Sequence, residues 1–159
     1  MTLSPNITVR EYQALAQLRY VIRNFLAFSA EAARSCDIEP QQHQLLLAIK
    51  GLPPKQRPTI GFAANRLQLQ HHSAVELVKR SVARGLLKRE EGESDHREVL
   101  LRVTPLGERL LMKLSLAHRN ELRLAASDLI DALTEIVKVR KPRASSQKRA
   151  RNVAQRSVQ

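Results

Sequence analysis

Apolar residues recur at intervals of three, four and seven along residues 9–35, with arginines between them. This spacing is typical of a helix that packs through one side. The apolar positions are Tyr12, Leu15, Ile22, Phe25, Leu26 and Ala33. A second helix is predicted from Pro40, a residue favoured in the first turn, to a stop at Gly51. The stretch 51–58 contains three prolines and is predicted to be a loop.

Two shorter helices are predicted next, joined by a tight turn. The first follows Thr59, whose hydroxyl can cap a helix, and the second spans about 72–84 and stops at Gly85. The helical spacing then ends. Residues 86–91 and 98–104 are predicted as the two strands of a hairpin, because the second of them alternates apolar and polar positions.

The last third of the chain returns to helical spacing. Thr104 followed by Pro105 is typical of a helix start, and we expect one helix to about Ala125 and a separate one over about 128–138. Residues 140–159 have no periodicity and are predicted to be disordered. The predicted fold class is therefore mainly α with a small β-hairpin, in the order helix–helix–helix–helix–hairpin–helix–helix.

Residues 59–104 have the layout of a winged helix-turn-helix. Two short helices and a tight turn are followed at once by a two-stranded hairpin. The second helix of such a unit fits the major groove of B-DNA, and a hairpin beside it can reach phosphates or the adjoining minor groove. This segment therefore indicates DNA binding.

The predicted helix 72–84 divides into two sides when it is wound at about 100° per residue. The apolar side collects small aliphatic residues: Ala74, Val75, Val78 and Val82. The polar side begins with hydrogen-bonding groups that we assign to base edges: Gln70, His72, Ser73 and Glu76. Cations that we assign to phosphates follow: Lys79, Arg80 and Arg84. The alternative is an ordinary surface helix with a solvated polar side, but the preceding turn and the following hairpin favour DNA binding.

Charge supports a polyanionic partner without identifying it. The chain of 159 residues has 27 Lys and Arg against 15 Asp and Glu, a formal net charge of +12, which attracts nucleic acid or an anionic surface. Seven of these cations lie in residues 140–159, which contain no acid, so residues 1–139, expected to form one domain, retain +5. The basic tail either adds affinity for phosphates, which we favour, or has no function beyond solubility.

The sequence favours neither a secreted nor a membrane-spanning protein. Cys36 is the only cysteine, so no internal disulfide forms, and the acid that follows it favours an inert, buried or half-buried thiol. The first residues lack a secretory signal, and no apolar run reaches the roughly 18 residues that a bilayer requires. A cytoplasmic protein without a membrane partner is expected.

Catalytic and metal-binding patterns are absent from the sequence. There is no Gly-x-Ser-x-Gly motif, and five glycines leave no phosphate-cradling loop, so neither an enzyme nor a cofactor is expected. His71 and His72 are adjacent and diverge by about 100° on a helix, so they cannot chelate one metal ion. His43 and His118 are interpreted as packing residues or as residues that line a cavity between helices.

The chain resembles the MarR family of regulators from about residue 10 to residue 138. The segments that carry the resemblance are PQQHQLLLAIKG (40–51), TIGFAANRLQLQHHSAVELVKR (59–80), RGLLKRE (84–90) and SDHREVLLRVTPLGERLL (94–111). The last segment has the family pattern of Asp-x-Arg at the wing, followed by a strand and by Leu/Val-Thr-Pro-x-Gly. The matching residues are Asp95, Arg97, Thr104, Pro105 and Gly107.

This resemblance implies a homodimer formed by both ends of the chain, 9–35 and 105–139, with a DNA-binding part at 40–104. It also implies that Arg97 enters the minor groove while Asp95 holds it in place, and a narrow minor groove does attract a guanidinium. The alternative is that Asp95 and Arg97 form only a local ion pair that shapes the loop. A small aromatic or phenolic effector is implied between the dimerisation helices and the DNA-binding part.

Several positions depart from the family pattern. Glu39 stands where a Thr or Ser cap is usual, so the second helix is expected to begin less firmly. Phe62 and Ala63 replace an acidic residue and a leucine, and Lys79 replaces an acid. Ser81 replaces a leucine on the buried side, where its hydroxyl is expected to bond to a carbonyl one turn back.

The sequence therefore predicts a dimeric, sequence-specific transcriptional regulator, a repressor that its effector releases from a pseudo-palindromic operator. Two alternatives remain. One is a protein-interaction adaptor on a winged-helix scaffold. The other is a nonspecific architectural protein that binds DNA through residues 140–159.

Overall fold

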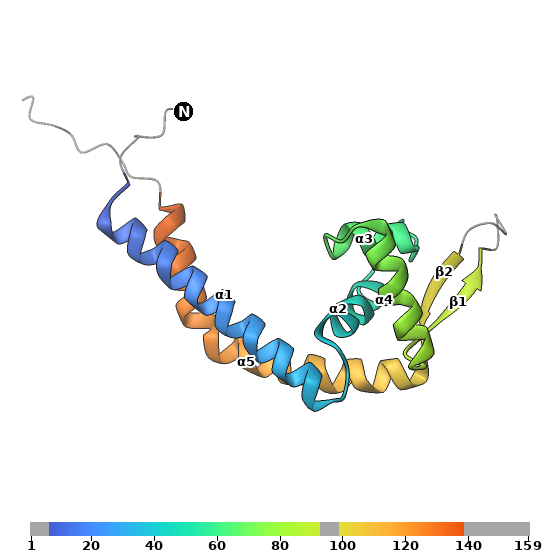
Figure 1. Cartoon of the computed structure of the whole chain (residues 1–159). Coiled ribbons are helices and arrows are strands. Elements are labelled where there is room, and N and C mark those ends of the chain that lie inside the picture. The colour runs from blue at the N-terminus through green and yellow to red at the C-terminus, as the bar shows by residue number, and fades with distance from the viewer. Residues whose placement is uncertain (1–6, 93–98, 139–159) are drawn as a thin grey trace, which may run out of the picture.

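The computed structural model describes residues 7–92 and 99–138. Two long helices, α1 (Val9–Ser35) and α5 (Pro105–Val137), lie side by side and form an arm (Figure 1). A lobe at one end of this arm contains the other elements: α2 (Pro40–Lys50), α3 (Ile60–Arg66), α4 (His71–Ala83), β1 (Leu87–Glu91) and β2 (Val99–Val103). The architecture is mainly helical with an antiparallel hairpin, as predicted. No helix in the described ranges combines the length and apolar character needed to cross a bilayer.

Threonines begin the two long helices and α3. The Thr8 hydroxyl accepts a hydrogen bond from the Glu11 N–H at 3.3 Å, and the Glu11 carboxylate accepts one from the Thr8 N–H at 2.6 Å. Thr59 and Thr104 each accept from the backbone N–H three residues later, at 3.1 Å. The predicted helix starts after Thr59 and Thr104 are confirmed.

The prediction of two separate helices after the hairpin is wrong. α5 is one helix of 33 residues that continues through Ser127 and Asp128. These residues are weaker helix formers, but no glycine or proline interrupts the segment, and alanines precede them. Asp128 also accepts a hydrogen bond from Gln17 Nε2 of α1 at 3.2 Å. This hydrogen bond joins α5 to α1 at the expected break.

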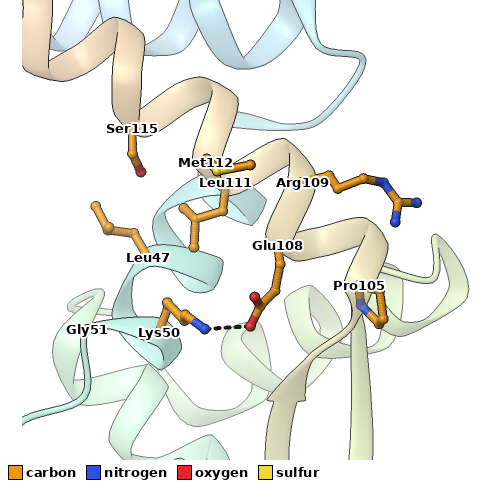
Figure 2. A pocket seen from close by; sticks show the side chains of 9 residues that line it. All are labelled: Leu47, Lys50, Gly51, Pro105, Glu108, Arg109, Leu111, Met112 and Ser115. Carbon is orange, nitrogen blue, oxygen red and sulfur yellow. Dashed lines mark hydrogen bonds and ion pairs between the residues drawn. The ribbon is translucent and has the colours of Figure 1, made fainter.

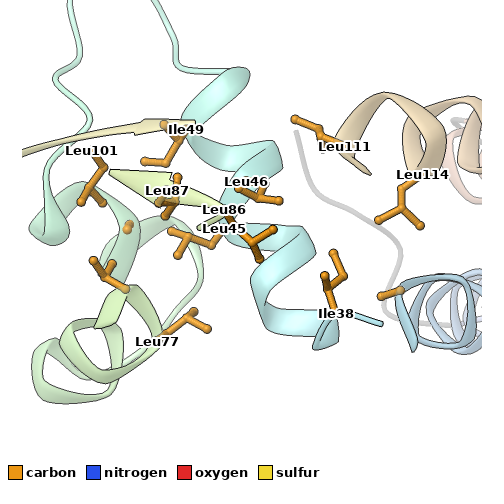
Figure 3. Packing of buried hydrophobic residues seen from close by; sticks show 13 residues of the cluster. Ile38, Leu45, Leu46, Ile49, Leu77, Leu86, Leu87, Leu101, Leu111 and Leu114 are labelled. Carbon is orange, nitrogen blue, oxygen red and sulfur yellow. The ribbon is translucent and has the colours of Figure 1, made fainter. Parts of the chain in front are cut away.

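The core of the lobe surrounds α2 and extends to the arm (Figure 3). Its members come from all the elements of the lobe, from both long helices and from the connections between elements: Ala33, Ile38, Leu45, Leu46, Ile49, Ala63, Leu77, Val78, Leu86, Leu87, Leu101, Leu111 and Leu114. Burying one leucine side chain stabilises a fold by about 1.5–3 kcal/mol relative to leaving it exposed. Because Leu111 and Leu114 lie on α5, the same hydrophobic burial holds the lobe against the arm.

The hairpin is attached to the helix-turn-helix by backbone hydrogen bonds. β1 and β2 pair antiparallel over their whole length. Outside this pair, Leu100 forms a bridge with Thr59, and the Leu101 N–H donates to the Pro58 carbonyl at 2.7 Å. The segment that begins α3 therefore fixes the hairpin relative to α3.

Two glycines allow α5 to start against the base of the hairpin. Gly85 has a φ of +68°, in the left-handed region that other residues rarely adopt. A Cβ at Gly107 would collide with the Leu86 carbonyl oxygen and would lie 2.8 Å from Val103 Cγ1. The matched glycine of the Thr-Pro-x-Gly pattern therefore has a steric role, because a side chain there would push α5 away from the strands.

We expect Gly107→Ala to lower the free energy of unfolding by about 2–3 kcal/mol, because overpacking a close backbone contact forces the main chain to move. Urea denaturation followed by circular dichroism measures this change. Gly61→Ala is the matched control, because a Cβ there meets Thr59 Oγ1 at an ordinary 3.8 Å. The control is expected to be neutral or slightly stabilising. Equal stability of Gly107→Ala and the wild type would contradict the close approach of α5.

Candidate nucleic-acid interface

A short turn, residues 67–70, joins α3 to α4. Gln68 has a φ of 55°, and the Leu69 N–H donates to the Ala64 carbonyl at 2.9 Å, so the turn closes back onto α3. Such a turn sets the angle between the two helices of a helix-turn-helix. The second of these helices, α4, lies beside the hairpin (Figure 1).

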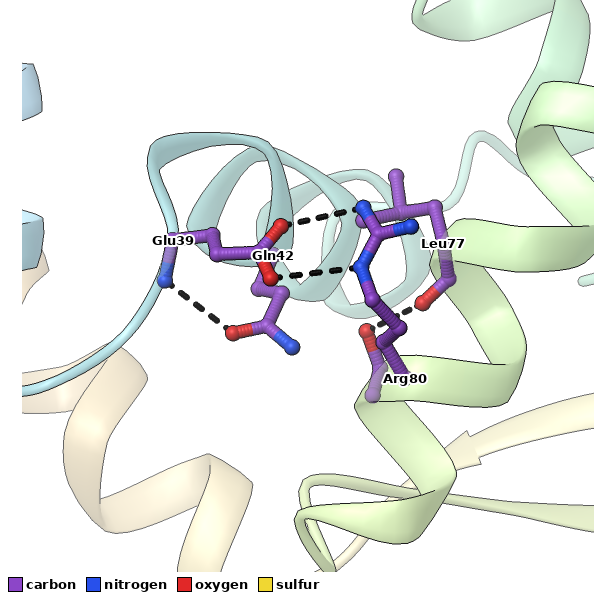
Figure 4. A network of polar contacts seen from close by, with 5 residues as sticks. Glu39, Gln42, Leu77 and Arg80 are labelled. Atoms are coloured by element: carbon purple, nitrogen blue, oxygen red, sulfur yellow. Dashed lines mark hydrogen bonds and ion pairs between the residues drawn. The ribbon is translucent and has the colours of Figure 1, made fainter.

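One side of α4 is buried in the core of the lobe. Its buried residues are Ala74, Leu77, Val78 and Ser81. The predicted apolar side omitted Leu77, although this residue fits the helical spacing, and Val75 and Val82 are only half-buried. Ser81 Oγ donates to the Leu77 carbonyl at 2.8 Å, which confirms the hydrogen bond expected for a hydroxyl on this side (Figure 4).

The opposite side of α4 is accessible and carries the predicted DNA contacts. The exposed members of the predicted set are Gln70, His72, Glu76, Lys79, Arg80 and Arg84. Ser73 is half-buried, at the border between the two sides. Gln70 precedes the helix as its N-cap and Arg84 follows it as its C-cap, so these residues extend along the full length of α4. Their contacts with DNA stay a prediction.

Each of the three predicted phosphate contacts on α4 has an acidic partner. Lys79 Nζ lies 2.6 Å from Glu76 Oε1, and this hydrogen bond holds the pKa of the Glu76 carboxyl below its usual range. All three cations are partly exposed. Ion pairs of this kind contribute about 0–1 kcal/mol each, so a phosphate could replace the acid at small cost.

The partners of Arg80 and Arg84 come from the corner between α1 and α2. Arg80 donates through Nε and Nη2 to the two carboxylate oxygens of Glu39, at 3.2 and 3.0 Å (Figure 4). Arg84 Nη2 lies 2.8 Å from Asp37 Oδ2 and also donates to the Asp37 carbonyl. Sequence analysis missed these acids, because they lie 41 and 47 residues from their partners. The sequence indicates of Glu39 only that it stands where a Thr or Ser cap is usual.

The predicted wing residues Asp95 and Arg97 lie outside the described residues, as does the tail 140–159. The described strands carry three cations that the sequence analysis did not assign: Lys88, Arg89 and Arg102. Lys88 and Arg102 both pair with Glu90, and Lys88 Nζ lies 2.8 Å from its carboxylate. The hydrogen bonds from Lys88 and from Arg102 hold the pKa of the Glu90 carboxyl below its usual range. The hairpin thus has basic side chains of its own.

A pair of buried histidines lies where α1, α2 and α5 meet. The rings of His43 and His118 are 4.7 Å apart. His118 Nδ1 lies 2.5 Å from the Leu114 carbonyl, and its Nε2 lies 2.8 Å from Ser29 Oγ. Neither nitrogen of His43 has a hydrogen-bond partner, and burial together with the nearby His118 lowers the pKa of His43 to about 4. Both histidines are packing residues, which is one of the two predicted roles.

A cleft of about 600 Å³ lies between the end of α2 and the start of α5 (Figure 2). Its wall is largely apolar, and its lining residues are Leu47, Lys50, Gly51, Pro105, Glu108, Arg109, Leu111, Met112 and Ser115. Lys50 Nζ and Glu108 Oε1 form an ion pair at 2.6 Å across the cleft. A cleft of this volume is large enough for a small organic molecule.

The cysteine and the exposed histidines do not form a metal site in the described residues. Cys36 is half-buried at the end of α1 and packs against the core, as expected. His71 and His72 are exposed at the start of α4. Among residues 7–92 and 99–138, no three His, Cys, Asp or Glu side chains come together in a way that could hold a metal ion.

Comparison with protein-family models gives a match over the helix-turn-helix and the first strand of the hairpin. Residues 37–98 match the model of the MarR family. This part of the chain is similar to a MarR-family domain. The match to this domain begins at Asp37, includes α2, α3, α4 and β1, and leaves out both helices of the arm.

Solved structures with the MarR-family fold are similar to a larger part of the chain than residues 37–98. A MarR family protein from Bacillus stearothermophilus is 20% identical, with a TM-score of 0.62 and coverage of 94% of this chain and 92% of its own. A transcriptional regulator from Thermotoga maritima is 25% identical, with a TM-score of 0.56 and coverage of 75% and 87%. A mutant of MepR from Staphylococcus aureus, bound to an oligodeoxyribonucleotide, is 15% identical, with a TM-score of 0.59 and coverage of 94% and 93%. No curated protein sequence matches the chain.

The stability of this domain is expected to depend on pH through His43. Its pKa of about 4 in the folded protein lies below the ordinary value of 6.5, so the unfolded chain binds an additional proton between these values. The free energy of unfolding should therefore be highest above pH 6.5. It should fall by up to roughly 3 kcal/mol as the pH drops from 6.5 through about 4. Urea denaturation across this window measures the change.

The matched variants for this experiment are His43→Phe and His71→Phe. His43→Phe removes the buried titrating group and should flatten the pH profile of stability. His71 is exposed at the start of α4, so its replacement should leave the profile unchanged. A profile that is as steep in His43→Phe as in the wild type would assign the pH dependence to other groups.

Proposed function

We propose that this protein is a sequence-specific transcriptional regulator that represses by occupying an operator as a homodimer. The observation that carries the proposal is the exposed polar side of α4, beside the hairpin, in the part of the chain that is similar to a MarR-family domain. Hydrogen-bonding groups lie toward the start of this helix and cations toward its end. In helix-turn-helix recognition, the first groups meet base edges and the second meet phosphates. The MepR mutant with the same fold is bound to an oligodeoxyribonucleotide, which supports DNA as the partner.

We propose that the homodimer forms through the arm. Many large apolar residues on its two helices are exposed: Val9, Tyr12, Tyr20, Ile22, Leu26, Met112, Leu116, Leu122, Ile130, Leu133 and Val137. Extended apolar surface of this kind marks an interaction site. A second copy of the chain offers the same surface, so pairing about a two-fold axis would cover both. The two α4 helices would then lie about 34 Å apart, which matches one turn of DNA.

We further propose that a small aromatic or phenolic effector binds in the cleft between α2 and α5. Leu47, Leu111 and Met112 offer an apolar wall for a ring. Arg109 and, once it is released from Glu108, Lys50 would offer cations for a phenolate or carboxylate. α2 belongs to the lobe and α5 to the arm, so a ligand between them would change the angle of the lobe. In a dimer this change would alter the distance between the two α4 helices and weaken operator binding.

The roles of the residues on α4 predict two different effects on DNA binding. Arg84→Ala and Lys79→Ala should weaken binding to all DNA and reduce the slope of log K against log salt by about one per lost phosphate contact. His72→Ala and Glu76→Ala should cost about 1–3 kcal/mol on the selected sequence and relax its specificity. Fluorescence anisotropy measures both, with a duplex that the wild type selects from a random library and a scrambled duplex.

Arg119→Ala is the matched control, because Arg119 is exposed on α5 of the arm. It should leave both affinities unchanged. If no substitution on α4 changes the affinity or the specificity for DNA, the proposed role of α4 is contradicted and the protein-interaction adaptor is favoured. Binding that loses all affinity when residues 140–159 are removed would favour the nonspecific architectural protein.

A charged side chain introduced on the exposed apolar side of α5 tests whether the proposed dimer forms through this surface. Ile130 shares one side of the helix with Leu133 and Val137, at spacings of three and four. Ile130→Glu should dissociate the dimer, and sedimentation velocity measures this. Leu124→Glu is the matched control, because Leu124 is 82% exposed and lies about 120° around the helix from Ile130. A monomeric wild type, or equal dissociation of both variants, would contradict the proposed interface.

A further inference from the structure

Two acids at the corner between α1 and α2 form ion pairs with the arginines at the end of α4. Glu39 binds Arg80 through both carboxylate oxygens, at 3.0 and 3.2 Å (Figure 4). Asp37 binds Arg84 through Oδ2 at 2.8 Å and through its carbonyl oxygen. Arg80 and Arg84 are four residues apart, so they lie on the same side of α4. The proposed phosphate-binding end of this helix is therefore neutralised from within the lobe.

We infer that Glu39, assisted by Asp37, is an internal counterion that competes with DNA phosphates for the arginines of α4 and so lowers the affinity for DNA. The inference rests on the proposed DNA binding. A carboxylate and a phosphate both present oxygens that match the fork of a guanidinium, so both seek the same donors. The Nε and Nη2 groups that Arg80 directs to Glu39 are the ones a bidentate phosphate contact would use. DNA must therefore displace Glu39 or forgo that contact.

The backbone of α2 holds Glu39 in place for this competition. Glu39 is the N-cap residue, Pro40 follows it, and its N–H donates to Gln42 Oε1 at 3.0 Å (Figure 4). The positive end of the helix dipole favours a carboxylate at this position. The residue expected to begin α2 less firmly is thus anchored by its own N–H, and its side chain reaches α4.

The two acids differ in how strongly they compete. The Glu39 side chain is 44% exposed and makes a two-point contact, whereas the Asp37 side chain is 98% exposed. An ion pair is screened more as its members become more exposed to solvent and salt. Glu39 is therefore the principal competitor, and Asp37 contributes less.

The experiment compares the affinity of full-length variants for DNA by fluorescence anisotropy. The probe is a duplex of about 30 base pairs that the wild type selects from a random library, long enough for two half-sites. Glu39→Gln keeps the size of the side chain and removes its charge. It should raise the affinity about two- to fivefold per protomer, the size of one exposed ion pair. Asp37→Asn should produce a smaller gain.

Two controls isolate the contact with Arg80. Glu31→Gln removes the same charge from an exposed acid whose partner is Arg34 on α1, 3.4 Å away, and should leave the affinity nearly unchanged. In an Arg80→Gln background, Glu39→Gln should give no further gain, because the competing donor is gone. Thermal melting by circular dichroism establishes that each variant is folded, and Asp37→Asn provides the test if Glu39→Gln is not.

Several results would overturn the inference. A lower affinity in folded Glu39→Gln would mean that Glu39 positions Arg80 for DNA. An equal gain in the Arg80→Gln background would mean that removal of any nearby acid suffices. A wild type that binds DNA while neither variant gains affinity overturns this inference alone. A wild type that selects no DNA overturns it together with the proposed function.

Discussion

Burial of Leu77 and Val78 against the core around α2 determines which side of α4 faces solvent. Both side chains are exposed by 1% or less. A rotation of α4 about its axis would expose them and bring Lys79 or Arg80 into a core with no partners for a charge. The loss of hydrophobic burial and the cost of a buried charge both oppose such a rotation. The polar side of the helix is therefore directed outward by the same contacts that stabilise the lobe.

The surrounding structure holds this helix relative to the other parts that a DNA-binding unit needs. Hydrogen bonds between β2 and the segment at Pro58 attach the hairpin to the start of α3. The close approach at Gly107 sets α5 against the base of the same hairpin. Leu111 and Leu114 then continue the core of the lobe onto the arm. The contacts of α4 that can change at low cost are the exposed ion pairs on its outer side.

Local signals in the sequence account for much of this fold. Thr59 and Thr104 cap helices through their own hydroxyls, and the spacing of residues 9–35 is that of a helix, so short-range patterns are sufficient there. The expected break near Asp128 was wrong: no glycine or proline interrupts the segment, and α5 packs along α1, which no local pattern indicates. Sequence reasoning also omitted Leu77 from the buried side of α4, although its spacing fits that side.

The features of the candidate site that the sequence did not predict also depend on contacts between distant segments. The pairing of Glu39 with Arg80 joins residues 41 positions apart, and no local pattern indicates it. The cleft has walls from residues 47–51 and 105–115, which come together only in the folded chain. By contrast, the polar side of α4 lies within one helix, and helical winding was sufficient to find it.

The central claim is that the exposed side of α4, present twice in a dimer, reads the major groove at two places. Methylation interference on a selected duplex tests it directly, because methylated guanine N7 blocks contacts in the major groove. Two groups of interfering guanines related by symmetry, with centres about 10 base pairs apart, are the predicted result. Absence of interference, or interference spread evenly along the duplex, would contradict the account.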